Sequence, residues 1–141
     1  GVQTCALPIS ELRQLHLRGA LQELLINAVE HGNLVISYAE KQEALARDEY
    51  DTLIVKRLMQ PRFSDRKVVV HVLYEPDAAR MVYRIVDEGA GFPWQRLLTQ
   101  SGDAIGLEEG CGRGIFLTRS LFPNLAYNER GNEAILTVPL G

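Results

Sequence analysis

The sequence has little of what marks several large classes of protein. Its only cysteines, Cys5 and Cys111, lack the spacing of metal ligands. No apolar run approaches the roughly 18 residues of a membrane span, and no basic segment precedes an apolar one as in a secretory signal. A net charge of -3 gives no basic surface for nucleic acid or an anionic membrane. We therefore expect a soluble cytoplasmic protein with neither nucleic acid nor membrane as a partner.

The length and composition are those of one globular domain. With 141 residues, 46% of them hydrophobic and 23% charged, the chain can bury a real core. Residues 1–9 resemble the translated read-through of a sequencing-adapter oligonucleotide, and we expect them to be non-native and disordered. The alternative is a genuine loop or strand remnant. We expect residues 10–141 to form a single domain.

Residues 11–31 have the pattern of an amphipathic helix. Apolar residues recur at helical spacing and form a stripe: Leu17, Leu21, Leu24 and Ala28. Glu23, Asn27 and His31 are successive i, i+4 neighbours and form a polar ridge beside it. Gly32 and Asn33 are typical helix-ending residues. Taken alone, the ridge fits a solvated surface as well as a binding site.

The rest of the chain predicts helices followed by antiparallel strands. Residues 34–60 are rich in helix-forming residues, and we expect Pro61 to end that helical region. Its mixed charges predict a solvated face, with a partner-docking surface as the alternative. Strands are expected at 67–74, 80–87, 125–129 and 133–138, paired as two hairpins, with a helix at 115–122.

Two glycine-rich segments have the residues of a nucleotide site. Asp87 ends a predicted strand and can accept a hydrogen bond from an adenine amino group, while Gly89 and Gly91 permit close backbone approach. The second segment, Gly110, Gly112, Arg113 and Gly114, opens a predicted helix. Bare N–H groups, the helix dipole and a guanidinium all favour a phosphate there. Ordinary turns are the alternative for each segment alone.

The polar ridge supplies the chemistry that these loops lack. The Asn27 carboxamide oxygen is a suitable hard ligand for Mg²⁺, which takes few protein ligands besides water and phosphates. Glu23, one turn earlier, can orient or deprotonate an attacking hydroxyl or water.

These motifs resemble those of a known superfamily. Glu23-x-x-x-Asn27-Ala-x-x-His31-Gly32 is similar to the N-box of the Bergerat-fold (GHKL) ATPases, which include gyrases, heat-shock chaperones, histidine kinases and mismatch-repair ATPases. Asp87-x-Gly89-x-Gly91 and Gly110-x-Gly112-x-Gly114 resemble its two glycine boxes. The segments 112–120 and 127–133 are similar to those of bacterial anti-sigma-factor serine/threonine kinases.

The resemblance implies an α+β fold, a two-layer sandwich with a mixed, mostly antiparallel sheet and helices on one face. It implies that ATP and Mg²⁺ bind, with Asn27 on the metal, Asp87 on adenine and segment 88–114 as lid and phosphate loop. Glu23 would be the catalytic base toward a Ser or Thr of an anti-anti-sigma-like partner. A sigma factor is the other implied partner, and the intact protein would form a homodimer.

Two departures accompany the resemblance. The family usually has a strand and a helix before the N-box, so we expect that part to be truncated here. Residues 34–66 are longer than the smallest kinases need and resemble variants attached to receiver or phosphatase modules. The alternative function is therefore a non-catalytic ATP-binding module that sequesters a partner within a larger bacterial signalling protein. Two other functions are disfavoured. A histidine-kinase catalytic domain would need a phospho-acceptor helix, and an ATPase coupled to DNA or chaperone work would need transducer domains, and the sequence shows neither.

Overall fold

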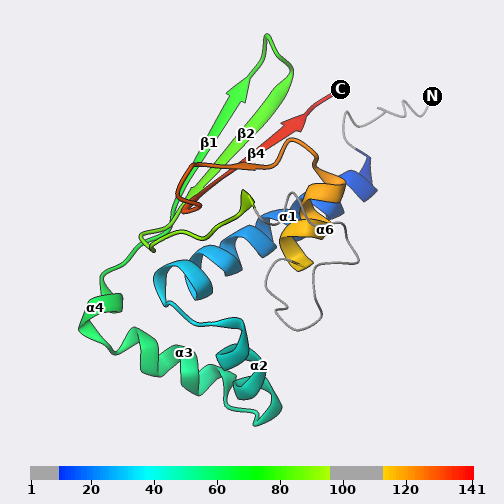
Figure 1. Ribbon diagram of the computed structural model, residues 1–141. Coiled ribbons are helices and arrows are strands. Elements are labelled where there is room, and N and C mark those ends of the chain that lie inside the picture. The colour runs from blue at the N-terminus through cyan, green and yellow to red at the C-terminus, as the bar shows by residue number, and fades with distance from the viewer. Residues whose placement is uncertain (1–9, 96–112) are drawn as a thin grey trace, which may run out of the picture.

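A four-stranded antiparallel sheet forms one layer of the protein, and helices α1 and α6 pack side by side on one of its faces (Figure 1). The computed structural model describes residues 10–95 and 113–141. The helices are α1 (Glu11–Asn27), η1 (Ala28–Asn33), α2 (Tyr38–Ala46), α3 (Tyr50–Leu58), α4 (Pro61–Ser64) and α6 (Arg113–Leu121). The strands are β1 (Val69–Glu75), β2 (Arg80–Val86), β3 (Ala126–Tyr127) and β4 (Glu133–Pro139). This arrangement confirms the predicted α+β fold class.

The strands lie in the order β1-β2-β4-β3, so each predicted hairpin contributes two neighbours and β2 meets β4 in the middle. Val70 pairs with Ile85 in the first hairpin, and Tyr127 pairs with Ala134 in the second. Pairing of Ile85 with Ala134 joins the two hairpins. The end of β2 and the start of β4 lie side by side, so Asp87 and the 128–132 turn lie at the same end of the sheet.

The core lies between the sheet and the two helices. Alternate residues of β4 are buried, as expected for a strand with one face toward a core. They meet the apolar stripe of α1, in which Ala20, Leu24 and Ala28 are buried and Leu17 and Leu21 are partly buried. The stripe thus confirms the predicted amphipathic helix, and its burial fixes the polar ridge beside it.

The end of that helix differs from the prediction. Residues 28–33 form a single π-helical segment, η1, in which the backbone ladder is one residue wider than in an α-helix. The Leu34 N–H donates to the Val29 carbonyl at 2.9 Å, and the Ile36 N–H donates to the Glu30 carbonyl at 2.8 Å. The widened turn buries Glu30 and Asn33, two polar residues that an uninterrupted α-helical pattern does not predict to be buried.

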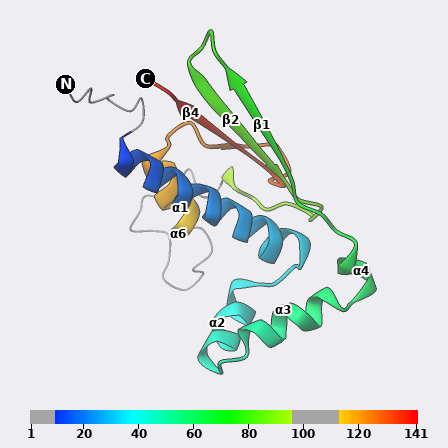
Figure 2. The same ribbon diagram turned by 180° about the vertical axis from the view of Figure 1, so that it is seen from behind.

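The region 34–60 forms two helices rather than one, and they extend from the end of α1 away from the sheet (Figure 2). The Ser37 hydroxyl and the Glu40 carboxylate form a complete capping box that starts α2. The helices of this region end before Pro61, as expected, since α3 ends at Leu58. Pro61 occupies the first turn of α4, where its missing N–H costs nothing.

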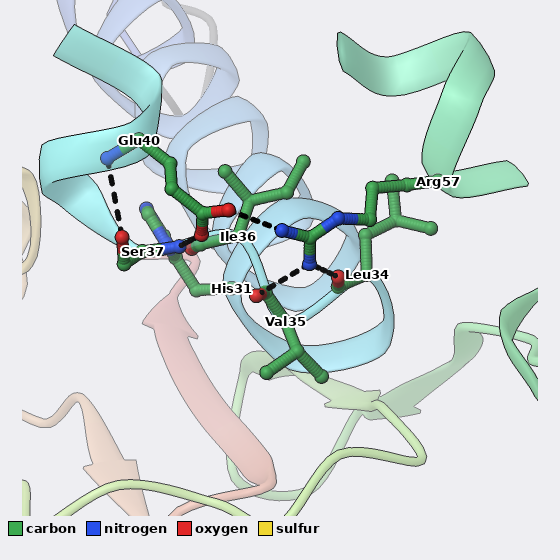
Figure 3. Close-up of polar contacts among 7 residues, drawn as sticks. All are labelled: His31, Leu34, Val35, Ile36, Ser37, Glu40 and Arg57. Carbon is green, nitrogen blue, oxygen red and sulfur yellow. Dashed lines mark hydrogen bonds and ion pairs between the residues drawn. The ribbon is translucent and has the colours of Figure 1, made fainter. Parts of the chain in front are cut away.

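A small second core holds these helices to the end of η1. It consists of Leu34, Ile36 and Phe63, with Leu53 and Ile54 packed against it. Arg57 donates to the carbonyls of Leu34 and Val35, both at 2.9 Å, and pairs with Glu40 (Figure 3). One guanidinium therefore ties α3 to both the 34–37 segment and α2. None of the described helices has the length and apolarity that crossing a membrane requires.

Candidate functional site

A cavity of about 200 Å³ opens between the second half of α1, η1, the ends of β2 and β4, and the first turn of α6. Five of the predicted site residues line it: Glu23, Asn27, Asp87, Gly91 and Gly114. They come from segments up to ninety-one residues apart in the sequence. The fold therefore brings the polar ridge and parts of both glycine motifs to one cavity.

Glu23 and Asn27 form one wall of this cavity. The Asn27 side-chain amide donates to Glu23 Oε1 at 3.3 Å, so the ridge residues are neighbours as the i, i+4 spacing predicts. On its other side, Glu23 lies against the start of α6, since a Cβ placed on Gly114 would come within 1.8 Å of Glu23 Oε1. The first turn of α6, whose N–H groups have no acceptor within the helix itself, thus lies beside this carboxylate.

Asp87 lies at the opposite part of the cavity and accepts a hydrogen bond from the Gly89 N–H at 2.8 Å. Burial raises the pKa of the Asp87 carboxyl above its usual range, although the Gly89 N–H and the charges of Arg66 and Arg130 act against that rise. In its ionised form, the carboxylate is the acceptor that an exocyclic amino group needs.

Gly32 and Gly89 permit the close contact that fixes Asp87. A Cβ on Gly32 would lie 2.4 Å from the Asp87 Cγ atom, and one on Gly89 would lie 2.4 Å from the Gly32 carbonyl oxygen. Gly91 lines the cavity and has a φ of 82°, a left-handed conformation that glycine adopts without strain. The first glycine motif therefore packs the strand end against η1, a role that the sequence pattern did not predict.

The positions of the two carboxylates give the cavity its length. Gly32, which contacts Asp87, follows Glu23 by nine residues, about two turns along the wall that α1 and η1 form. Asn27 lies between them on the same wall. The cavity can thus hold an elongated ligand with a hydrogen-bond donor at one end and a reacting group at the other.

An aromatic group that the sequence analysis did not select forms another part of the wall. Phe92 and Tyr127 line the cavity, and Tyr127 packs edge-to-face on Phe92 with ring centroids 5.0 Å apart. Trp94 stacks on Tyr127 at 6.2 Å and donates its indole N–H to the Asn128 carbonyl at 2.7 Å. Burial and the charges of Glu23 and Asp87 raise the pKa of Tyr127, so its phenol stays protonated.

Two residues of α2, Tyr38 and Lys41, also line the cavity and were missed. Their segment was predicted as a solvated helix face, and no local pattern indicates that the η1 turn directs α2 back toward the site. His31, the last residue of the predicted ridge, lines the cavity too. Its Nδ1 lies 2.5 Å from the Ile36 carbonyl oxygen, so Nδ1 carries the proton and donates it there (Figure 3).

The remaining predicted site residues have other positions. Gly89 lies behind Asp87, and Arg113 is an exposed residue in the first turn of α6 that is not among the described residues lining the cavity. Gly110 and Gly112 lie outside the described residues, as do most of the expected lid and residues 1–9. The phosphate-binding role of residues 110–114 stays a prediction.

The donor set at the Glu23 end fits a hard cation such as Mg²⁺ only in part. The Glu23 carboxylate and the Asn27 carboxamide lie side by side. The Asn27 NH₂ group faces Glu23, which leaves the Asn27 carbonyl oxygen available as a metal ligand. Within residues 10–95 and 113–141, no group of three or more His, Cys, Asp or Glu side chains could hold a metal. Phosphate and water oxygens would have to complete the coordination of the ion.

A comparison with models of protein families identifies the family of the chain. The sequence profile of the histidine kinase-like ATPase domain matches residues 3–138, nearly the whole chain. The chain belongs to this family. No curated protein and no solved structure matches the chain. For a histidine kinase-like ATPase domain, the cavity between Glu23 and Asp87 is the candidate ATP site, and ATP is the ligand that the family supports.

Proposed function

We propose that this histidine kinase-like ATPase domain binds ATP with Mg²⁺ and transfers the terminal phosphoryl group to a Ser or Thr of an anti-anti-sigma-like protein. One observation carries the proposal. Two carboxylates stand at the two ends of a single cavity, Asp87 against Gly32 and Glu23 against Gly114. Asp87 accepts the adenine amino group, and Glu23 faces the phosphate end, where the glycine-rich segment leads into α6.

In the transfer step, the Glu23 carboxylate takes the proton of the acceptor hydroxyl. The hydroxyl oxygen forms a bond to the γ-phosphorus, the bond between that phosphorus and the β–γ bridging oxygen breaks, and ADP leaves. Mg²⁺, when bound, would neutralise charge on the phosphates, with Asn27 as its protein ligand. Asn27 also positions Glu23, because its amide donates to Oε1.

A second candidate is an ATP-binding module that sequesters a partner without phosphorylating it. The observation that favours it is the engagement of Glu23 itself. Its carboxylate is bonded to Asn27 and confined by Gly114, a contact that a general base must leave before it meets an acceptor hydroxyl. In this function, Glu23 would act only as a structural partner of α6.

Two substitutions separate binding from transfer. Asp87→Asn replaces an oxygen acceptor by an amide that can present N–H to the adenine amino group, so we expect it to remove the rise in melting temperature that ATP with Mg²⁺ produces. Glu23→Gln keeps the bond from Asn27 and should retain that rise while abolishing label transfer from γ-labelled ATP to an anti-anti-sigma acceptor. Undiminished transfer by Glu23→Gln would exclude the base role, and no ATP-dependent rise in the unsubstituted protein would exclude the nucleotide site.

A further inference from the structure

Lys41 contributes the one Lys or Arg side chain among the described residues that line the cavity. It comes from the first turn of α2, a segment outside every motif identified in the sequence. Its side chain is 23% exposed, so it is neither free in solvent nor sealed in the core. A partly buried ammonium on the wall of a cavity that already contains two carboxylates is chemically matched to an anionic ligand.

The negative charges of the proposed ligand favour a cation in the wall of the cavity. ATP brings several negative charges into a cavity that is lined by the carboxylates of Glu23 and Asp87. Repulsion between like charges in one cavity opposes binding. Mg²⁺ at Asn27 would offset part of this repulsion. Lys41 is the described cavity-lining side chain that can offset more of it by donating N–H to phosphate oxygens.

Lys41 is also held in place. Its Nζ lies 2.5 Å from Glu30 Oε2, and the Glu30 side chain is only 7% exposed. The Tyr50 hydroxyl donates to the other Glu30 oxygen, and the Tyr50 ring lies 5.6 Å from the Lys41 ammonium. Because Glu30 belongs to η1, the widened helical turn itself positions the lysine. An ammonium has three N–H donors, so one can engage Glu30 while another meets a ligand.

We propose that Lys41 is a nucleotide-binding residue that contacts the phosphate chain of ATP, with Glu30 as the residue that positions it. The inference rests on the proposed function. Glu30 follows Asn27 by three residues and precedes Gly32 by two. This level on the helix lies between the proposed metal ligand and the Asp87 end, where the phosphates nearest the ribose would pass.

The test measures the affinities of ATP, ADP and adenosine by calorimetry for the unsubstituted protein and three variants. Lys41→Gln removes the ammonium, and we expect ATP and ADP to bind about tenfold more weakly while adenosine changes less than about twofold. Glu30→Gln keeps a side-chain oxygen that can hold Lys41 and removes the negative charge that competes with the phosphates, so ATP should bind equally or more tightly. Lys56→Gln, on the exposed side of α3, is the matched control and should leave all three affinities unchanged.

The different effects of Lys41→Gln and Glu30→Gln on ATP affinity distinguish a binding role of Lys41 from a structural one. If Lys41 only stabilises Glu30, the two substitutions will weaken ATP and adenosine alike, and the proposal is overturned. Lys41→Gln leaves Glu30 buried without its cation, which can prevent folding. The double substitution Glu30→Gln with Lys41→Gln removes both charges and should reproduce the selective loss of ATP. Binding that depends on Asp87 but not on Lys41 would overturn this inference alone, whereas absent binding by the unsubstituted protein would overturn the proposed function as well.

Discussion

Gly114 and Glu23 are in direct contact at one end of the cavity. A Cβ placed on Gly114 would lie 1.8 Å from Glu23 Oε1 and 2.1 Å from its Cδ. With Glu23 in this position, the first turn of α6 leaves no room for a side chain at Gly114. The contact links the conformation of α6 to the position of the proposed base, although the two residues are ninety-one positions apart in the sequence.

Gly114→Ala tests this link. The added methyl group must displace the Glu23 carboxylate, so we expect phosphoryl transfer to fall by about 10²-fold or more, the usual contribution of a general base. Stability should not fall, because Glu23 is a flexible side chain and Ala replaces Gly in a helix, a change worth about 0.5–1 kcal/mol in favour of folding. Label transfer and the melting temperature measure the two effects separately.

Gly19→Ala is the matched control for that substitution. Gly19 lies in α1 and is exposed, and an added Cβ would meet no described atom within 4 Å. We expect the same gain of about 0.5–1 kcal/mol with unchanged nucleotide binding and transfer. Equal behaviour of the two alanine variants would mean that the Gly114–Glu23 contact has no functional role.

Asp87→Asn should weaken ATP binding without lowering the stability of the ligand-free protein. Burial raises the pKa of Asp87 in the native state above its value in the unfolded chain. Such a group favours folding below the unfolded pKa, and this contribution is lost as the pH rises through the native pKa. Above the native pKa the ionised carboxylate therefore opposes folding, and Asp87→Asn should melt there at the same or a higher temperature. A lower melting temperature without ligand would contradict this account.

The same shift gives nucleotide binding a pH dependence. The proposed contact with adenine needs the ionised Asp87, so the affinity for ATP should decline on acidification through the raised native pKa, at a higher pH than for an ordinary aspartate. Titrating ATP by calorimetry between pH 7 and pH 4 measures this decline. Glu23→Gln is the control, because it leaves Asp87 intact and should show the same midpoint for the loss of binding.

Much of the site could be predicted from the sequence because its residues lie in local patterns. The i, i+4 spacing of Glu23 and Asn27 determines that they share a helix face, and helix geometry alone brings them into contact. The hairpins were predictable for a similar reason, since each consists of strands adjacent in sequence. Asp87 follows from its place at a strand end.

The rest depends on long-range geometry. Lys41 lines the cavity from α2, which follows the π-helical segment η1, and no propensity predicts a π-helix there. Strand β1 is rich in apolar residues, yet its Val72 and Leu73 side chains are 55% and 54% exposed. Its edge position comes from the pairing order β1-β2-β4-β3, and a strand's own residues do not specify its place in that order.

Trp94 provides an intrinsic probe of the site. It is the single tryptophan of the chain, and its ring stacks on Tyr127, which lines the cavity. A nucleotide that contacts Tyr127 should change the surroundings of the indole, so we expect ATP to alter the tryptophan emission in a saturable way. Asp87→Asn should abolish the change while leaving the emission of the free protein similar. A spectrum insensitive to ATP under conditions where calorimetry detects binding would place the ligand away from Tyr127.

Arg57 should be the most sensitive position outside the cavity. Its guanidinium makes hydrogen bonds to the carbonyls of Leu34 and Val35 and an ion pair with Glu40, and its side chain is only 16% exposed (Figure 3). A lysine cannot reproduce this planar fork, so Arg57→Lys should lower the free energy of unfolding by about 2–4 kcal/mol. Arg47→Lys is the matched control.

The Arg47–Glu43 pair is 63% and 61% exposed, so its change should stay within about 0.5 kcal/mol, as for surface ion pairs generally. Urea unfolding measures both differences. Because the segment that Arg57 holds also supplies the Ile36 carbonyl to His31, Arg57→Lys should weaken ATP binding too. Equal stability of the two lysine variants would show that the small core of Leu34, Ile36 and Phe63 holds α3 in place without this guanidinium.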